Sequence, residues 1–523
     1  MSELIDLKDK TLIDMLLEEQ QQVGTPVGRF ADAAESESGG QGGRFGDLIP
    51  LSAPRKGEQY AFQVDLDRCS GCKGCVTACH SLNGLDEDET WRDIGSLVGE
   101  GEQGPYLQTV TTACHHCVEP GCLIGCPVNA YEKDEASGIV LHLDDQCIGC
   151  QYCVLKCPYD VPKYSSKRGV VRKCDMCHSR LSSGEAPACV QACPHEAIKI
   201  VTVETNEVLA KSSRGGGFLP ASPDPSYTKP STSYISSKKL PDNLVAADAH
   251  VLRPQHTHWP LVGLLALSQI GIGGFLASAF SWERGGDIAY AIAWGVLHVG
   301  LLCSALHLGQ PLKAWRIFVG FRRSWLSREA VVLGFCSGIS IPALGAICLG
   351  WFGFSDYAAA VGPWGKVAAW ASALVGLIGV LTSVFIYVDT QRSFWRLRIS
   401  AFKFYGSVVL GALSFAAIAA GGVGLFEVLS INLVLALKLF GEWKSLHENA
   451  VTVRLVEGPL STIWKLRLFS AAVVAATVVL GYFLGGLWLA LVGLASVCLS
   501  ELLERVLYFK AVNAPKMPGG HNG

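Results

Sequence analysis

Sixteen of the 20 cysteines lie between Cys69 and Cys193, in four runs with short and regular gaps. The first and third runs read Cys-x2-Cys-x2-Cys-x3-Cys; the middle gap is four residues in the second run and eleven in the fourth. In the compact spacing, three thiolates of one loop can bind three irons of a cubane, while the fourth reaches a neighbouring cluster. A tetrahedral zinc ion needs only two separated cysteine pairs and has no use for the third cysteine. The pattern therefore predicts 4Fe–4S clusters rather than zinc.

Disulfide bonds are the other common use of many cysteines, and they occur mainly in secreted chains. The opening MSELIDLKDKTLIDMLLEEQ is acidic throughout and has no apolar core long enough for a secretion signal. We therefore expect a protein without an export signal, whose clustered cysteines bind metal. The remaining cysteines, Cys303, Cys336, Cys348 and Cys498, stand alone in apolar segments and are expected to be small buried hydrophobes.

The second half of the sequence consists of apolar segments separated by short polar or glycine-rich breaks. Each segment is about long enough to cross a ~30 Å hydrocarbon layer as a helix. The eight segments lie at residues 260–281, 288–308, 329–351, 364–387, 402–421, 423–441, 467–484 and 486–508. The sixth carries Glu427, Asn432 and Lys438, which makes it the weakest candidate. These segments predict a transmembrane bundle.

The expected fold is an α+β double ferredoxin-like iron–sulfur domain followed by an all-α, eight-helix transmembrane bundle. The expected parts are an N-terminal extension at 1–58, the four-cluster domain at 59–203, a flexible linker at 204–257, the membrane anchor at 258–510 and a tail at 511–523. The linker is expected because that stretch is too rich in Gly, Ser and Pro to make a core. An amphipathic helix at 7–24 is expected to dock a partner, since such a helix is marginal alone in water. A frayed tail is the alternative.

The four cysteine runs, in this order and with the gap of eleven in the last, resemble the iron–sulfur subunit of the dimethyl sulfoxide reductase family of molybdoenzymes. The resemblance implies that runs one and four share two clusters and that runs two and three share two more. The implied ligand sets are Cys69, Cys72, Cys75 and Cys193; Cys79, Cys174, Cys177 and Cys189; Cys114, Cys117, Cys122 and Cys157; and Cys126, Cys147, Cys150 and Cys153. All sixteen positions are cysteine, so four 4Fe–4S clusters are expected.

The membrane half resembles the anchor subunit of the same family. The matching stretches are His258-Trp-Pro-Leu261, Gln269, His307-Leu-Gly-Gln-Pro311, Leu326-Ser-Arg-Glu-Ala330 and Glu501-Leu-Leu-Glu-Arg505. The resemblance implies a quinone site at His307 and Glu329, with Gln269 as a further candidate, menaquinone or ubiquinone as the exchangeable substrate, and no haem. The residue types agree, because ionisable groups at a membrane span are costly and usually functional, and quinol oxidation releases protons. The structural alternative is that His307 ends a helix and that Glu329 pairs with Arg328 or Arg322.

Charge asymmetry predicts the orientation of the bundle. With eight spans, the even-numbered loops share one side with the cluster domain, and they carry most of the cations: Lys313, Arg316, Arg322, Arg323, Arg328, Arg392, Arg396, Arg398, Lys403, Lys438, Lys444, Arg454, Lys465 and Arg467. The opposite loops carry little beyond Arg284. By the positive-inside rule, we expect a multi-pass protein of the inner (plasma) membrane with its cluster domain on the cytoplasmic face. In this it is similar to sulfite-oxidising relatives of the family.

The expected function is an electron relay between the membrane quinone pool and a separate catalytic subunit that carries molybdopterin guanine dinucleotide, in anaerobic or sulfur-compound respiration. No pterin-binding region is evident, so the protein is not expected to act on the terminal substrate alone. An ion-translocating membrane protein is one alternative, disfavoured because no inverted repeat is evident. A membrane-tethered redox sensor is another, although one labile cluster would suffice for sensing. The net charge of −3 gives no indication of nucleic-acid binding.

Overall fold

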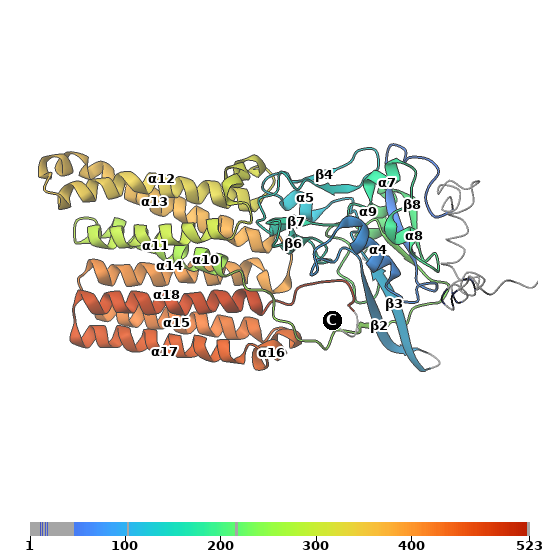
Figure 1. Ribbon diagram of the computed structural model, residues 1–523. Coiled ribbons are helices and arrows are strands. Elements are labelled where there is room, and N and C mark those ends of the chain that lie inside the picture. Colours follow the sequence, from blue (N-terminus) through green and yellow to red (C-terminus); the bar gives the residue numbers. More distant parts are fainter. Residues whose placement is uncertain are drawn as a thin grey trace, which may run out of the picture.

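The computed structural model describes residues 47–101, 104–214 and 218–519, together with the isolated positions 11, 13, 16 and 18. Its two halves lie end to end, with a small α+β domain at one end of a long helical bundle (Figure 1). This arrangement confirms the expected fold class. The helix expected at 7–24 lies almost entirely outside the described residues.

The first half is held together by short strands and short helices. Its elements are β1 (Glu58–Asp65), α4 (Gly74–Asn83), β2 (Asp93–Gly101), β3 (Gly104–Thr112), α5 (Gly121–Gly125), β4 (Tyr131–Lys133), β5 (Val140–His142), α6 (Tyr152–Lys156), β6 (Lys163–Ser165), β7 (Val170–Arg172), α7 (His178–Ser182), α8 (Ala188–Gln191) and β8 (Ile198–Glu204). Strand β1 pairs antiparallel with β8, with Phe62 opposite Ile200, and both side chains are buried. The two ends of the cysteine-rich region therefore meet in one sheet.

The stretch 204–257 is not the flexible linker that its composition predicts. It forms α9 (Thr205–Ser213), β9 (Ser233–Ile235), which pairs parallel with β1, and β10 (Val245–Ala246), which pairs antiparallel with β2. The backbone N–H groups of Val118 and Glu119 donate to the carbonyls of Lys229 and Thr228. A polar segment needs no core of its own when existing sheet edges satisfy its backbone, which is why composition misled here.

The second half is a bundle of long helices that run roughly parallel to one another (Figure 1). Its elements are α10 (Trp259–Phe280), α11 (Gly286–Leu306), the 3-10 helix η1 (Pro311–Gly320), α12 (Trp325–Trp351), α13 (Ser355–Val388), η2 (Ser393–Trp395), α14 (Leu397–Ala419), α15 (Leu425–Leu446), α16 (Ala450–Glu457), α17 (Ser461–Leu484) and α18 (Leu487–Lys510). Eight of them correspond to the eight apolar segments of the sequence.

Seven of the helices in the described part of the protein are long and apolar enough to cross a membrane. The eighth, α15, has 22 residues but carries charged side chains. Of these, Lys438 and Glu442 are buried inside the bundle, where other helices supply their partners. These charges lower the mean hydropathy of α15, although Lys438 and Glu442 face the interior of the bundle.

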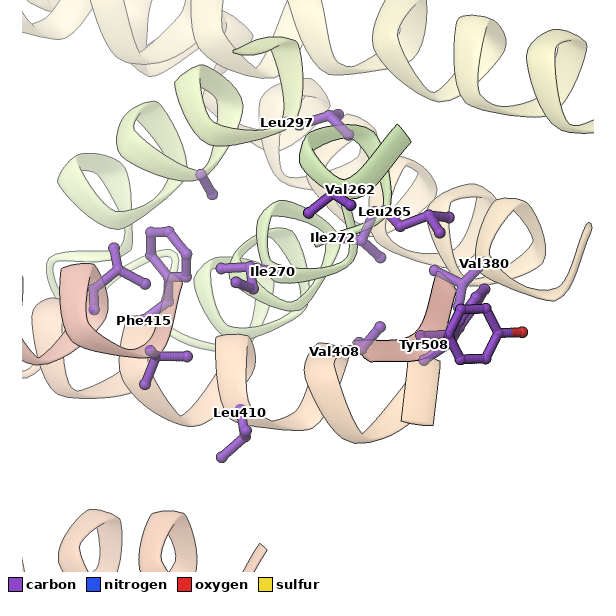
Figure 2. Packing of buried hydrophobic residues seen from close by; sticks show 14 of the residues in the cluster. Val262, Leu265, Ile270, Ile272, Leu297, Val380, Val408, Leu410, Phe415 and Tyr508 are labelled. Atoms are coloured by element: carbon purple, nitrogen blue, oxygen red, sulfur yellow. The ribbon is translucent and has the colours of Figure 1, made fainter. Parts of the chain in front are cut away.

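Helix α10 forms the centre of the bundle, with 83% of its most apolar window buried, more than in the other six candidate spans. Figure 2 shows its buried residues, among them Ile270 and Ile272, surrounded by side chains of α11, α13, α14 and α18. At Gly411 of α14, a Cβ would lie 2.6 Å from the carbonyl oxygen of Ile270. Small residues allow such close approach between membrane helices, where packing replaces the hydrophobic effect.

After α18 the polypeptide returns to the first half instead of ending at the membrane surface. The backbone N–H of Ser96 donates to the carbonyl of Gly519 at 3.1 Å, Lys516 pairs with Asp248, and Met517 is buried. The segments that precede and follow the bundle in the sequence therefore both contact the cysteine-rich domain.

Candidate functional site

All sixteen clustered cysteines are free thiols, and most are buried. The disulfide alternative therefore has no support in the described residues. No three His, Cys, Asp or Glu side chains in the described part of the protein converge on a single ion, as a zinc site would require. A cubane instead spreads its four thiolates over four irons.

The mutual effects of the thiols show which of them are neighbours. The pKa of Cys79 is raised to about 12, first by burial and then by the thiols of Cys189 and Cys177. Burial, and then the thiols of Cys189 and Cys193, raise the pKa of Cys75. Burial also raises the pKa of Cys117, with further contributions from Cys114, Cys157 and Cys122. The pKa of Cys153 is raised by burial and then by Cys150, Cys147 and Cys126. The structure thus brings together thiols of each implied set, including Cys75 and Cys193 from opposite ends of the domain.

Thiols of successive sets also lie near one another. Cys75 of the first set is influenced by Cys189 of the second, and Cys174 of the second by Cys114 of the third. Between the third and fourth sets stands Tyr131, whose buried hydroxyl is influenced by Cys122 and Cys153. The four groups therefore follow one another through the domain.

Backbone N–H groups point at several of the sulfur atoms. Ala130 donates to Cys126 Sγ at 3.2 Å, Gly149 to Cys147 Sγ at 3.3 Å, and Ala197 to Cys193 Sγ at 3.2 Å. Such donors stabilise thiolate charge and are the usual surroundings of iron–sulfur sulfur atoms. Neighbouring thiols with amide donors fit the chemistry of a 4Fe–4S cluster.

A cavity of about 310 Å³ lies where the cysteine-rich domain meets the bundle. Its polar lining consists of Cys150 and Tyr152 from the domain and Ser304, His307, Glu329 and Tyr387 from the bundle; the rest is mainly Leu, Ile and Ala of α10–α13 and η1. This volume and this lining, apolar with a few polar groups, are typical of small-molecule sites.

His307 and Glu329, the two residues expected to form a quinone site, both line this cavity. His307 follows α11, and its Nε2 lies 3.0 Å from the carbonyl oxygen of Cys150. Glu329, near the start of α12, is buried and accepts a short hydrogen bond from Ser383 Oγ of α13. The carboxylate has no arginine partner among the described residues, so the alternative of a pair with Arg328 or Arg322 is not what the structure shows.

Gln269 differs from the expectation that grouped it with the quinone site. It is not among the residues that line the cavity. Its Oε1 instead accepts from Arg505 Nη2 at 2.6 Å. A lone amide on an apolar helix does not reveal whether its partner is a ligand or a distant arginine.

Three imidazoles lie in a row that leads from the cavity towards water. The rings of His307 and His258 are 5.0 Å apart, as are those of His258 and His256. His258 and His256 line a second cavity of about 520 Å³ between the domain and the bundle, and His256 is exposed. Burial, then the charges of His307 and His256, lowers the pKa of His258 to about 4.

The domain is fixed over the bundle by contacts on both sides of the cavity. Lys156 of α6 pairs with Asp389 after α13, with Nζ 2.7 Å from Oδ2, while Tyr152 donates to the carbonyl of Ile386 at 3.0 Å. In η1, Lys313 and Arg316 both donate to the carbonyl of Asp145, at 3.1 and 3.0 Å. These two cations thus connect η1 to the domain.

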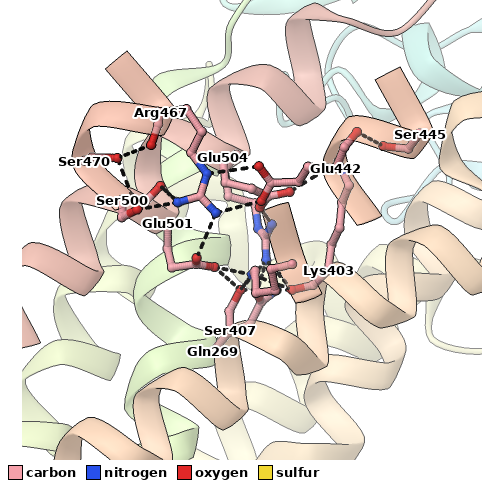
Figure 3. Close-up of polar contacts among 12 residues, drawn as sticks. Gln269, Lys403, Ser407, Glu442, Ser445, Arg467, Ser470, Ser500, Glu501 and Glu504 are labelled. Atoms are coloured by element: carbon pink, nitrogen blue, oxygen red, sulfur yellow. Dashed lines mark hydrogen bonds and ion pairs between the residues drawn. The ribbon is translucent and has the colours of Figure 1, made fainter. Parts of the chain in front are cut away.

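A separate network of ionised groups lies inside the bundle (Figure 3). Its charged members, each no more than 2% exposed, are Lys403, Lys438, Arg467 and Arg505 with Glu442, Glu501 and Glu504. Glu501 of α18 is central: its Oε2 lies 2.5 Å from Lys438 Nζ and its Oε1 3.6 Å from Arg467 Nη2. Glu442 binds Arg467 through both carboxylate oxygens, at 2.7 and 3.0 Å. The network links α10, α14, α15, α17 and α18.

Comparison with known proteins places both halves in one family. Residues 106–203 match the model of the 4Fe–4S dicluster domain, and residues 254–508 match that of the DMSO reductase anchor subunit (DmsC). The B subunit of the anaerobic dimethyl sulfoxide reductase of Haemophilus influenzae is 36% identical over 175 residues, which are 32% of the present sequence and 84% of the relative. The protein belongs to the dimethyl sulfoxide reductase family. Within that family it joins an iron–sulfur electron-transfer subunit and a membrane anchor in one polypeptide.

Other relatives match the iron–sulfur half of this dimethyl sulfoxide reductase-family protein in the same way. The B subunit of the Escherichia coli anaerobic dimethyl sulfoxide reductase is 35% identical over 180 residues, 33% of the present sequence and 86% of the relative. The E. coli formate dehydrogenase-O iron–sulfur subunit is 35% identical over 170 residues, 29% of the present sequence and 56% of the relative. The iron–sulfur half is thus similar both to a dimethyl sulfoxide reductase subunit and to a formate dehydrogenase subunit.

Proposed function

We propose that this protein relays electrons between a quinone in the 310 Å³ cavity and a separate molybdenum-containing catalytic subunit, through four 4Fe–4S clusters. The observation that carries the proposal is the cavity itself. It places His307 and Glu329 of the bundle beside Cys150, a ligand of the fourth set, on the side of the bundle that faces the cysteine-rich domain.

The four thiol sets supply the electron path. The fourth set, Cys126, Cys147, Cys150 and Cys153, borders the cavity through Cys150. The first set lies at the other end of the series, and its Cys72 is exposed. Clusters held by these sets would carry single electrons between the cavity and a partner that covers Cys72. The relatives that are B subunits of dimethyl sulfoxide reductases imply such a catalytic partner, and we assign it molybdopterin guanine dinucleotide.

The cavity residues supply the proton chemistry that a quinone requires. Quinol oxidation releases two protons as two electrons leave. Glu329 and His307 are placed to bind the two oxygens of the head group and to exchange those protons. His258 and His256 extend the polar path from His307 to water. Electrons and protons would thus leave the cavity by different exits.

We further propose that the cysteine-rich domain lies on the cytoplasmic face of the inner membrane. The support is the distribution of cations: Lys313, Arg316, Arg322 and Arg323 lie in the η1 loop beside the domain, and the positive-inside rule assigns such loops to the cytoplasm. Proteolysis of inside-out and right-side-out vesicles tests this assignment.

Replacing His307 by Ala or Glu329 by Gln tests the quinone site. Both variants are expected to lose quinol-driven cluster reduction, followed as bleaching of the visible absorbance, while dithionite still reduces all clusters. His447→Ala is the matched control, because His447 also ends a long helix of the bundle but does not line the cavity. Normal quinol oxidation in both variants would place the site elsewhere.

Iron and sulfide analysis of the anaerobically purified protein tests the cluster number. About 16 of each per polypeptide is expected for four 4Fe–4S clusters. Zinc in place of iron, without a brown chromophore, would contradict the proposal.

A further inference from the structure

Among the residues that the structure describes, Arg92 is a buried cation without a carboxylate partner. It precedes β2 and is only 2% exposed. Its Nη1 donates to Thr111 Oγ1 at 3.1 Å, while Nε and Nη2 have no partner in the described part of the protein. The adjacent Asp93 is exposed and accepts from the backbone N–H of Ile94, and Glu89 is already bound to Arg172 at 2.8 Å.

An unpaired buried guanidinium is unfavourable unless negative charge lies close to it. Stacking over the Phe62 ring, with Cζ 4.6 Å from its centroid, provides only a small part of that compensation. The structure must therefore contain another source of negative charge near Arg92.

Cysteines of two different ligand sets supply that charge once they bind iron as thiolates. Burial alone would lower the pKa of Arg92, but nearby cysteine thiolates outweigh it and hold the pKa above its usual value. The thiolates concerned are Cys75 of the first set and Cys79, Cys174 and Cys189 of the second. Thr111, which accepts from Arg92, also lies 3.6 Å from Cys75 Sγ. Arg92 is thus linked through Thr111 to the first set, and it lies within electrostatic reach of cysteines of the second.

We propose that Arg92 is the shared counter-ion of the clusters held by the first and second sets, and that it raises their reduction potentials. The inference rests on the proposed cluster assignment. A 4Fe–4S cluster with four thiolate ligands becomes more negative by one charge when it is reduced. A fixed cation in a low-dielectric interior therefore stabilises the reduced form more than the oxidised form. Arg92 would make the two outer clusters better electron acceptors than they would otherwise be.

The position of Arg92 bears on the direction in which electrons move along the proposed series of clusters. The cation lies among ligands of the two sets that follow one another away from the quinone cavity, and not among those of the fourth set. Arg92 would therefore favour the presence of the electron on the clusters of the first and second sets, which lie farther from the quinone.

Redox titration monitored by electron paramagnetic resonance tests the proposal on the intact, anaerobically purified protein. Arg92→Gln is expected to lower the midpoint potentials of two of the four clusters. The reduced-to-oxidised ratio at a fixed potential should fall at least about tenfold, which corresponds to ~59 mV for one electron. Arg92→Lys, which keeps the charge, should retain most of the wild-type potential.

Arg68→Gln is the matched control, because Arg68 adjoins the first ligand, Cys69, but its side chain is 50% exposed. Water and salt screen such a charge, so its removal should move the potentials far less. Unchanged potentials in Arg92→Gln, or equal shifts in the Gln and Lys variants, would overturn the proposal.

Cluster content settles the case in which Arg92→Gln does not assemble fully. Loss of clusters in Arg92→Gln with retention in Arg92→Lys supports a counter-ion, since the retained charge distinguishes the two. Loss in both variants overturns it in favour of a purely steric role. Absence of 4Fe–4S signals in the wild-type protein would instead contradict the proposed function itself.

Discussion

His307 and Cys150 belong to different halves of the molecule, yet they share a hydrogen bond. The Nε2 atom of His307 lies 3.0 Å from the carbonyl oxygen of Cys150. Because a carbonyl only accepts, Nε2 carries the hydrogen, and Nδ1 of the neutral ring is left as an acceptor. An imidazole of the cavity is thereby oriented by the same loop that presents Cys150, a proposed cluster ligand.

Replacing Cys150 by Ser is expected to remove or convert the cluster of the fourth set and leave the other three. Iron content should fall from about 16 towards about 12 per polypeptide. Quinol-driven reduction of the remaining clusters should fail, because the set nearest the cavity is interrupted. Cys303→Ser is the control, since Cys303 lies in α11, belongs to no cysteine run and does not line the cavity. An unchanged spectrum in Cys150→Ser would contradict the ligand assignment.

Replacing Asp389 by Ala is expected to loosen the junction between domain and bundle. The change leaves Lys156, 2% exposed, without its carboxylate. Breaking a buried pair costs about 3–5 kcal/mol, and the 33% exposure of Asp389 should reduce this to roughly 1–3 kcal/mol. The shift is measurable as earlier loss of quinol-linked electron transfer on heating in detergent. Asp160→Asn removes an exposed pair with Lys163 and should change stability by less than ~1 kcal/mol. Equal effects of the two changes would argue against a special role for the junction.

The ion network is expected to behave as a unit in a double-mutant cycle. Glu501→Leu alone leaves Lys438 buried without its carboxylate and should cost about 3–5 kcal/mol. Adding Lys438→Met removes the orphaned charge, so the double variant should be more stable than the sum of the single changes predicts. A coupling of about 1–3 kcal/mol in unfolding in detergent is expected. Strict additivity would show that the two groups do not depend on each other.

Replacing His258 by Phe is expected to slow quinone turnover without affecting the clusters. The ring keeps its packing against His307, but the polar link to His256 is lost. A decrease of up to ~100-fold in quinol oxidation is expected, with unchanged reduction by dithionite. His256→Phe should have a smaller effect, because that position is already in contact with water. Wild-type turnover in His258→Phe would show that protons leave by another route.

The membrane half was readable from the sequence because lipid imposes one strong requirement, a run of apolar residues long enough to span it. Helices such as α10 and α13 follow directly. The sequence also marked the segment containing Lys438 as the weakest, and the structure gives the reason. Charges that pair inside a bundle lower the average hydropathy of a helix without exposing it to lipid.

Other features depend on partners far away in sequence and could not be read from local pattern. Thr228 and Lys229 bond to a loop more than a hundred residues earlier, so a polar stretch became part of a folded domain. Asp389 resembles any acid at a helix end until Lys156 is placed beside it. Nothing in the sequence indicated that Arg92 is buried near the cysteines, since an arginine in a charged stretch is normally solvated. Only burial and the absence of a carboxylate identify it.

The tail that bonds Gly519 to Ser96 means that two stretches of polypeptide hold the cysteine-rich domain to the bundle, the covalent 204–257 segment and the docked tail. The local concentration of the domain at the cavity is therefore set by the geometry of these stretches and does not depend on expression level or dilution. The proposed transfer between a quinone and the first cluster would then be a unimolecular step, with one iron–sulfur domain for each anchor. Dilution of the purified protein should consequently leave the rate constant of this step unchanged, in contrast to a complex whose iron–sulfur and anchor parts are separate polypeptides.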